Sequence, residues 1–115
     1  MKIFIDDERD PPGDNIDWLV FRGMIPFMKY LDEQIAKEIY MLPSYISFDH
    51  DLGEGQPTGF DIAKKLVEMD MDGLLEFIPN FQWTVHSQNP VGKENINELL
   101  KCYLNFKNAY YECDD

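Results

Sequence analysis

The sequence predicts an α/β fold in which helices cover a mainly parallel sheet as a three-layer sandwich. Short runs of β-forming residues alternate with longer segments whose apolar residues recur at helical spacing, as is typical of parallel sheets with helical crossovers. Acidic residues and histidines follow directly after the predicted strands, where ligands bind in folds of this class. The 115 residues, 44% of them hydrophobic, predict a single domain spanning residues 1–115.

The predicted strands are short and rich in β-branched or aromatic residues. They lie at residues 2–5, 18–21, 45–48 and 81–85. The first is apolar throughout, as expected of a central strand that is buried on both faces. Few residues separate the first two strands, which leaves little room for a crossover helix between them. The direction of the second strand therefore stays open.

Three helices are predicted between and after these strands. The first begins at Pro26, which suits a first helical position, and ends before Pro43. Residues 58–61 have the pattern of a capping box and predict the start of the second helix. The third runs from about residue 93 to 107, and residues 109–111 are expected to add a short edge element.

The charge and the cysteines limit the classes of partner and compartment. A net charge of −12 repels duplex DNA and anionic membranes, so neither is expected as a partner. No apolar run approaches the roughly 18 residues of a membrane span. Cys102 and Cys113 show neither pairing nor metal-site spacing, which indicates a reducing, cytoplasmic location.

Aspartates follow two of the predicted strands. Asp6 and Asp7 come after the first strand, and Asp49 and Asp51 come after the third. Carboxylates crowded at one edge of a sheet repel one another unless a cation or a shared proton holds them together. We therefore expect Asp6, Asp7 and Asp49 to bind a divalent metal, Mg²⁺ or Mn²⁺. The structural alternative is a solvated loop in which these acids only cap turns.

Both histidines of the chain also follow predicted strands. His50 lies between Asp49 and Asp51, and His86 follows the fourth strand. A carboxylate beside an imidazole fixes its tautomer and suits it to general acid–base catalysis. The expected catalytic residues are His50, His86, Asp49 and Asp51, with the two histidines sharing the proton transfers of phosphodiester cleavage.

Several further residues are candidates for binding the substrate. Arg9 and Arg22 can each neutralise a phosphate, although Arg22 can equally pair with a surface acid. Ser87 and Asn89 offer hydrogen-bonding groups, or else they shape a turn. Lys93 lies at the start of a predicted helix, where backbone N–H groups bind anions, or else it is simply solvated. The expected substrate-binding set is Arg9, Ser87, Asn89 and Lys93.

Four motifs together resemble the cyclic-phosphate processing receiver domain family. They are DDER with a following PG, ISFDHDLG, TGFD and VHSQNPVG, and the resemblance extends from residue 3 to about residue 100. It implies a flavodoxin-like, receiver-like sheet with an acidic pocket at its strand ends. Asp6 and Asp7 match the metal-binding pair of receivers, and Asp49 matches their phosphate-accepting aspartate. His50 and His86 are foreign to signalling receivers but fit the cyclic-phosphate branch.

The expected function is a metal-assisted phosphoesterase that acts on cyclic phosphates of nucleotides or RNA ends. The alternative is a non-catalytic receiver-like binding module, or an acidic inhibitor that binds a basic protein partner. A third hypothesis, a receiver phosphorylated on Asp49, is disfavoured because the Lys-Pro dipeptide of receivers is absent. An inhibitor needs its acids spread over an outer face, whereas an enzyme needs them gathered in one pocket.

Overall fold

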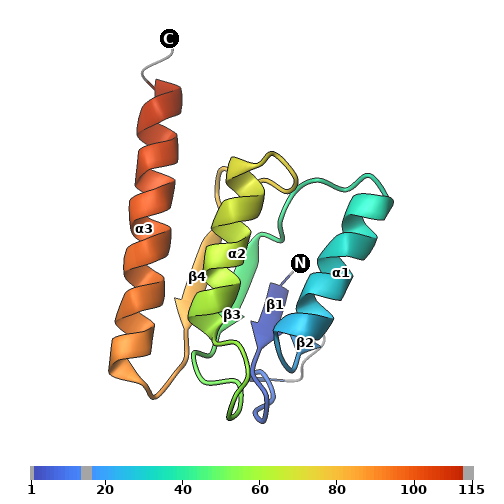
Figure 1. The fold of residues 1–115 in the computed structure, drawn as a ribbon, viewed down its shortest axis with the longest axis vertical. Coiled ribbons are helices and arrows are strands. Elements are labelled where there is room, and N and C mark those ends of the chain that lie inside the picture. Colours follow the sequence, from blue (N-terminus) through green and yellow to red (C-terminus); the bar gives the residue numbers. More distant parts are fainter. Residues whose placement is uncertain (1, 14–16, 113–115) are drawn as a thin grey trace.

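Four parallel strands form the sheet of this protein, and the computed structural model describes residues 2–13 and 17–112. The strands lie in the order β2-β1-β3-β4 (Figure 1). Their bounds are Lys2–Ile5 for β1, Trp18–Phe21 for β2, Tyr45–Phe48 for β3 and Gln82–Val85 for β4. The predicted α/β class and receiver-like parallel sheet are confirmed. The direction of β2, which the sequence left open, is parallel to β1.

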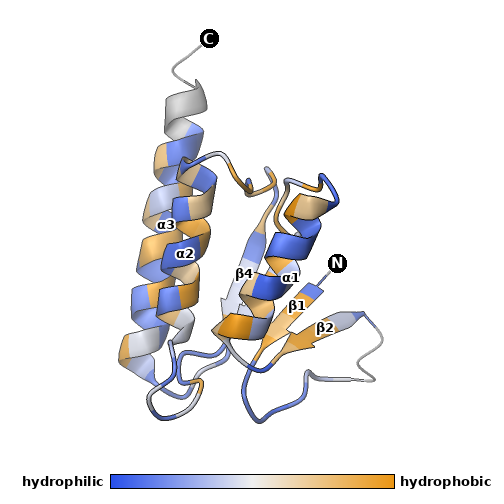
Figure 2. Cartoon of the chain, turned by 45° about the vertical axis from the view of Figure 1, so that its right-hand side comes forward, coloured by the Kyte–Doolittle hydropathy of each residue, from blue (hydrophilic) through white to orange (hydrophobic). Residues whose placement is uncertain are grey.

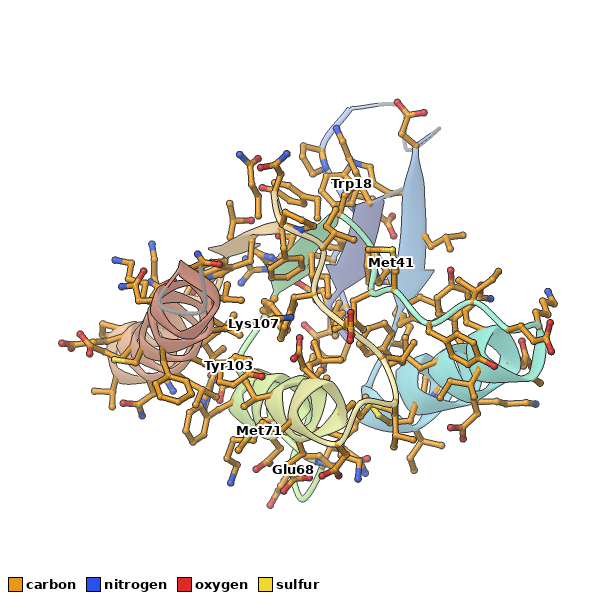
Figure 3. All side chains as sticks on the ribbon, turned by 90° about the horizontal axis from the view of Figure 1, so that it is seen from above. Trp18, Met41, Glu68, Met71, Tyr103 and Lys107 are labelled. Atoms are coloured by element: carbon orange, nitrogen blue, oxygen red, sulfur yellow. The ribbon has the colours of Figure 1, made fainter. Side chains whose placement is uncertain are left out.

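The three helices all lie on one face of the sheet, so the described residues form two layers where three were expected (Figures 1 and 3). They are α1, Met24–Ala36; α2, Gly59–Met71; and α3, Pro90–Glu112. Helix α1 connects β2 to β3, and α2 connects β3 to β4, so both connections run in the same direction across the sheet. Connections between parallel strands are right-handed, and two such connections in the same direction place both helices on the same face. The opposite face would be covered by a helix between β1 and β2, but the described part of that connection contains none.

The hydrophobic core lies between the sheet and the helices. Alternate strand residues point to opposite faces, and Ile3, Ile5 and Phe48 project toward the helices and are fully buried. They pack against the apolar stripes of α1, α2 and α3. Figure 2 shows the hydrophobic residues of β1 and β2 and the mainly hydrophilic loops at the end of the sheet where the strands finish.

The opposite face of the sheet, which we call the open face, carries aromatic and hydroxyl side chains. Trp18 lies on this side, away from the helices (Figure 3). Its ring packs edge-on against Phe4 and Tyr45, with centroid distances of 5.6 and 5.7 Å. Phe4 is only 4% exposed because its neighbours cover it. Ser47 and Thr84 occupy the next positions in register on this face.

Helix α1 ends earlier than the sequence predicts. It finishes at Ala36, well before Pro43, because Glu38 adopts a left-handed conformation with φ 62°. The N–H of Glu38 donates to the carbonyl of Ile35, and the N–H of Ile39 donates to that of Gln34, both at 2.9 Å. This is a Schellman motif. Its left-handed position is usually glycine, so a glutamate there gave no signal in the sequence.

Helix α3 is longer than predicted and extends beyond the sheet (Figure 1). It begins at Pro90 and runs through residues 109–111, so the expected edge element is wrong: these residues are helical. Asp70 of α2 holds α3 in place by accepting from the Tyr103 hydroxyl at 2.8 Å and from the Lys107 ammonium at 2.7 Å. No helix in the described part of the chain is both long and apolar enough to cross a membrane. Cys102 is an exposed free thiol, and Cys113 lies outside the described residues.

The capping box predicted at residues 58–61 is confirmed. The hydroxyl oxygen of Thr58 accepts from the N–H of Asp61 at 3.2 Å, and the carboxylate of Asp61 accepts from the N–H of Thr58 at 2.9 Å. Replacing Thr58 by alanine removes one half of the box and is expected to lower the free energy of unfolding by about 1 kcal/mol. Urea denaturation measures this change. Thr58→Ser keeps the hydroxyl and should stay near the wild type, and equal losses in both variants would contradict the capping role.

Candidate active site

An acidic pocket lies where the strands end. The loops after β1 and β3 leave the same end of the sheet (Figure 1) and enclose a cavity of about 470 Å³. The cavity is lined by acidic and polar residues from both loops and from the segment after β4: Asp6, Asp7, Glu8, Arg9, Asp49, Asp51, Gly53, Glu54, Ser87 and Gln88. A larger, mostly apolar cavity of about 610 Å³ lies between α3 and the segment that leads into β4, and it includes none of the predicted site residues.

Backbone pairing brings three of the predicted site residues side by side. The ladder of the parallel sheet continues one residue past each strand. The backbone N–H groups of Asp6, Asp49 and His86 donate to the last carbonyl of the neighbouring strand at 3.1, 3.0 and 2.9 Å. These three residues therefore occupy equivalent positions across the sheet and project on the side of the open face.

Asp6 is almost completely buried, with 1% of its surface exposed. One carboxylate oxygen accepts from the backbone N–H groups of Glu8 and Arg9, at 2.9 and 2.8 Å. Burial pushes the pKa of Asp6 upward, but these two backbone donors and His86 outweigh it and hold the pKa below its ordinary value. Asp6 is therefore a carboxylate at neutral pH.

Asp49 is in the opposite electrostatic situation. Its side chain is 7% exposed. Burial and, after it, the negative charge of Asp6 raise the pKa of Asp49, while His86, the Ser87 hydroxyl and Arg9 oppose the rise. The two carboxyl groups thus have pKa values that are displaced in opposite directions, as is typical of paired acids at functional sites.

His86 lies beside the two carboxylates at the candidate metal site. Its Nε2 lies 3.0 Å from a carboxylate oxygen of Asp6, and its ring is stacked on Phe4 with centroids 4.4 Å apart. One donor atom each from Asp6, Asp49 and His86 lies within 4.8 Å of the other two. Two buried carboxylates that repel each other suit a divalent cation, which offsets both charges. Asp7 lines the same pocket, with a carboxylate oxygen close to Gly53.

His50 has a different set of partners. Its Nδ1 lies 2.9 Å from a carboxylate oxygen of Asp51 and 3.4 Å from the amide nitrogen of Asn89. An ionised carboxylate only accepts hydrogen bonds, so the neutral ring carries its proton on Nδ1 and keeps a lone pair on Nε2. The ring packs closely on Gly92, where an added Cβ would lie 2.3 Å from the ring. Gly92 therefore makes room for this histidine.

The remaining predicted residues are divided between the pocket and its surroundings. Arg9 lines the pocket, and its guanidinium lies 4.0 Å from Asp6 and 3.4 Å from the backbone oxygen of His86. Ser87 also lines the pocket. Asn89 caps α3, since its side-chain oxygen accepts from the N–H of Gly92 at 3.0 Å. Lys93 is exposed on the first turn of α3 and is not among the residues that line the pocket.

Of the two roles expected for Arg22, the structure shows the pairing with a surface acid: its guanidinium lies 2.6 Å from Asp10. Arg22 also donates to the backbone oxygens of Asp6 and Arg9 and so stabilises the loop after β1.

Ser47 has a role that the sequence did not assign. Ser47 lies inside β3, and its hydroxyl is 2.7 Å from Nδ1 of His86. Its position one strand away from His86 and on the same face follows from the two-residue period of strands, which is the signal that would have found it.

One comparison with known proteins identifies a family. The model of the family described as Cyclic-phosphate processing Receiver domain matches residues 1–102. Neither the curated proteins nor the solved structures contain a match to the chain.

Proposed function

The chain belongs to the cyclic-phosphate processing receiver domain family, and on that premise we propose that its acidic pocket is the active site of a metal-assisted phosphoesterase. The proposed substrates are cyclic phosphates of nucleotides or of RNA ends. The observation that carries this proposal is the convergence of Asp6, Asp49 and His86 within 4.8 Å at the end of the sheet. These residues are distant in the sequence and share one place only in the folded chain.

The charge of the pocket supports the participation of a cation. Most of the residues that line it are acidic, with Arg9 as the one cationic side chain among the described lining residues. An anionic phosphate enters such a pocket only if positive charge is added. Asp6 and Asp49 are the carboxylates that would hold Mg²⁺ or Mn²⁺, with Asp7 at the same pocket. A divalent ion bound there supplies Lewis-acid polarisation of a phosphoryl oxygen.

His50 is the proposed general base. Asp51 accepts a hydrogen bond from its Nδ1–H at 2.9 Å, which leaves the lone pair of Nε2 to take a proton from water. This pairing of an imidazole with a carboxylate resembles the orienting pair of nucleophilic hydrolases. Asn89 donates to the other carboxylate oxygen of Asp51 at 3.5 Å, and the close packing of Gly92 restricts the ring further.

His86 and Arg9 are proposed to act on the leaving and phosphoryl oxygens. The Nε2–H of His86 is directed at Asp6 and is the proposed donor to the leaving oxygen. Arg9 and the hydroxyl of Ser87, both at the pocket, bind the phosphoryl oxygens. Lys93 stays a candidate for attracting the anion from the first turn of α3.

The proposed reaction is a balanced hydrolysis. A water oxygen forms a bond to phosphorus as one phosphorus–oxygen bond of the cyclic phosphate breaks. His50 removes the proton from the attacking water, and the departing oxygen takes up the proton that His86 donates and becomes a hydroxyl. His86 regains a proton from solvent. The product is a phosphomonoester, and His50 returns its proton to solvent.

The test is turnover of 2′,3′-cyclic nucleotides in the presence of Mg²⁺ or Mn²⁺, followed by chromatography of the monoester product. His50→Ala and His86→Ala are each expected to lower kcat by roughly 10²- to 10⁴-fold, because each removes a group that handles a proton. Lys65→Ala changes an exposed residue of α2 and serves as the matched control. Absence of turnover with every divalent metal would refute the function, and full activity of both histidine variants would refute their roles.

A non-catalytic binding module is the competing hypothesis. An acidic inhibitor of a basic protein would present its carboxylates on an outer surface. Here Asp6 and Asp49 are buried, and they share a pocket with further acids, which supports a small-ligand site. A stoichiometric basic partner that is still recovered with the His50→Ala, His86→Ala double variant would favour the inhibitor.

A further inference from the structure

A chain of hydroxyl groups crosses the open face and ends on the ring of His86. The Tyr45 hydroxyl donates to Thr84 Oγ1 at 3.0 Å, and the Thr84 hydroxyl donates to Ser47 Oγ at 3.1 Å. Ser47 Oγ lies 2.7 Å from Nδ1 of His86. None of these three hydroxyl residues lines the acidic pocket, yet they connect to one of its central side chains.

The sheet itself produces this alignment. Ser47 of β3 is in register with Thr84 of β4, and residues two positions apart on a strand point to the same face. Tyr45 therefore shares a face with Ser47, and Thr84 shares it with His86. Because no described helix covers this face, the Tyr45 end of the chain reaches the surface, whereas Ser47 is only 4% exposed.

The direction of every hydrogen bond follows from Asp6. One oxygen of its carboxylate accepts from the backbone N–H groups of Glu8 and Arg9, and the other faces Nε2 of His86 at 3.0 Å. A carboxylate only accepts hydrogen bonds, so Nε2 carries the proton of that bond. In a neutral imidazole the other nitrogen, Nδ1, is then an acceptor, and Ser47 must donate to it. Ser47 in turn accepts from Thr84, which accepts from Tyr45. Each donor and each acceptor along the chain is matched.

One face of the His86 ring is also packed against an aromatic side chain. It is stacked on Phe4 with an interplanar angle of 7°, and Phe4 is packed edge-on against Trp18. The stacking fixes the plane of the ring. The two hydrogen bonds determine which of the two orientations related by a ring flip is occupied. A flip of the ring would lose the bonds to both Asp6 and Ser47.

We propose that the Tyr45–Thr84–Ser47 chain holds His86 in the tautomer whose proton is on Nε2, with Ser47 and Thr84 as positioning residues. Hydrogen bonds in series polarise one another, so each hydroxyl strengthens the donor that follows it. The catalytic meaning of this tautomer rests on the proposed function, since it places the N–H of His86 beside Asp6 and Asp49. The tautomer itself is a property of the metal-free protein.

The test is the ¹⁵N resonance of each ring nitrogen of His86 in metal-free protein at a pH where the ring is neutral. His50→Gln assigns the signals, because the chain has two histidines. In the wild type, Nε2 is expected to be protonated, and Nδ1 unprotonated but hydrogen-bonded. Ser47→Ala should move the Nδ1 resonance toward that of a nitrogen with no hydrogen bond. Thr84→Val should move it in the same direction by less.

Thr84→Ser is the matched control, since it restores the hydroxyl and should restore the wild-type resonance. A proton on Nδ1 in the wild type would overturn the proposal, as would an unchanged Nδ1 resonance in Ser47→Ala or identical resonances in Thr84→Val and Thr84→Ser. The proposed function fails separately: an inactive protein with the expected tautomer would refute the phosphoesterase and leave the hydroxyl chain intact.

Discussion

Asp49→Asn is expected to stabilise the metal-free protein at neutral pH and at the same time to abolish its response to Mg²⁺ or Mn²⁺. Burial and the charge of Asp6 raise the pKa of Asp49 in the folded chain above its value in the unfolded chain. The ionised form of Asp49 therefore opposes folding. Asparagine has nearly the same shape and no charge, so it removes this opposition. Urea denaturation at several pH values measures the difference.

The sign of the pH dependence is determined by the direction of that shift. A carboxyl group with a raised pKa in the folded state costs stability in full above that pKa, and the cost fades as the pH falls through it toward the unfolded value. The gain of Asp49→Asn over the wild type should therefore be largest at neutral pH and disappear in acid. A gain that persists unchanged at low pH would show that the charge of Asp49 is not its source.

The response to metal should change in the opposite sense. A cation that binds only the folded wild type raises its free energy of unfolding by about 2.7 kcal/mol at a concentration roughly 100-fold above Kd. Asp49→Asn lacks one of the two carboxylates and should show little of this rise. Thermal denaturation with and without Mn²⁺ compares the two proteins.

Asp61→Asn is the matched control for both measurements. Its carboxylate accepts from the backbone N–H of Thr58, which lowers the pKa of Asp61 against a smaller opposing effect of burial. Its contribution is present above the unfolded pKa and is lost as the pH falls through the folded one. This variant should lose stability at neutral pH and keep the response to metal. An equal loss of that response in both variants would remove Asp49 from the metal site.

Gly59→Ala is expected to produce the largest loss of stability among single substitutions near the pocket. A Cβ at this position would lie 2.1 Å from the backbone oxygen of Asp49, and backbone cannot move aside as a flexible side chain can. The N–H of Gly59 also donates to the backbone oxygen of His50 at 2.8 Å, so α2 begins in direct contact with the site. We expect a loss of about 3 kcal/mol, at the upper end for overpacking, and a parallel loss of turnover.

Gly23→Ala provides the comparison for that loss. A Cβ at Gly23 meets no atom within 4 Å, and its backbone is extended, a conformation that alanine adopts readily. This variant should lose less than about 1 kcal/mol and keep full turnover. If Gly59→Ala were as mild as Gly23→Ala, the close approach of α2 to Asp49 would be contradicted.

The sequence predicted the strands and the start of α2 well because these depend on local signals. Strand bounds followed from β-forming runs, and the capping box of Thr58 and Asp61 is a contiguous motif. The end of α1 was missed because Glu38 takes a conformation that its residue type does not announce. The third layer was expected from the alternation of strands and helices, but the described part of the connection between β1 and β2 contains no helix, and both crossover helices lie on the same face of the sheet.

Part of the site was also predictable, because its position depends on where the strands end. Residues that follow parallel strands meet at one edge of a sheet, so Asp6, Asp49 and His86 were expected near one another, and the structure places them there. The role of Ser47 required knowledge of which strands are neighbours and in which register. Lys93 follows a strand in sequence yet lies outside the pocket lining, because Asn89 starts a helix that carries it away.

The most direct test of a shared metal and phosphate site is a crystal structure of the protein with Mn²⁺ and a slowly hydrolysed 2′,3′-cyclic phosphorothioate. We expect an anomalous manganese peak bound to the carboxylates of Asp6 and Asp49, with the cyclic phosphate in the same pocket. Manganese bound elsewhere, or a nucleotide bound away from these two aspartates, would show that the acidic pocket is not the site of metal and phosphate.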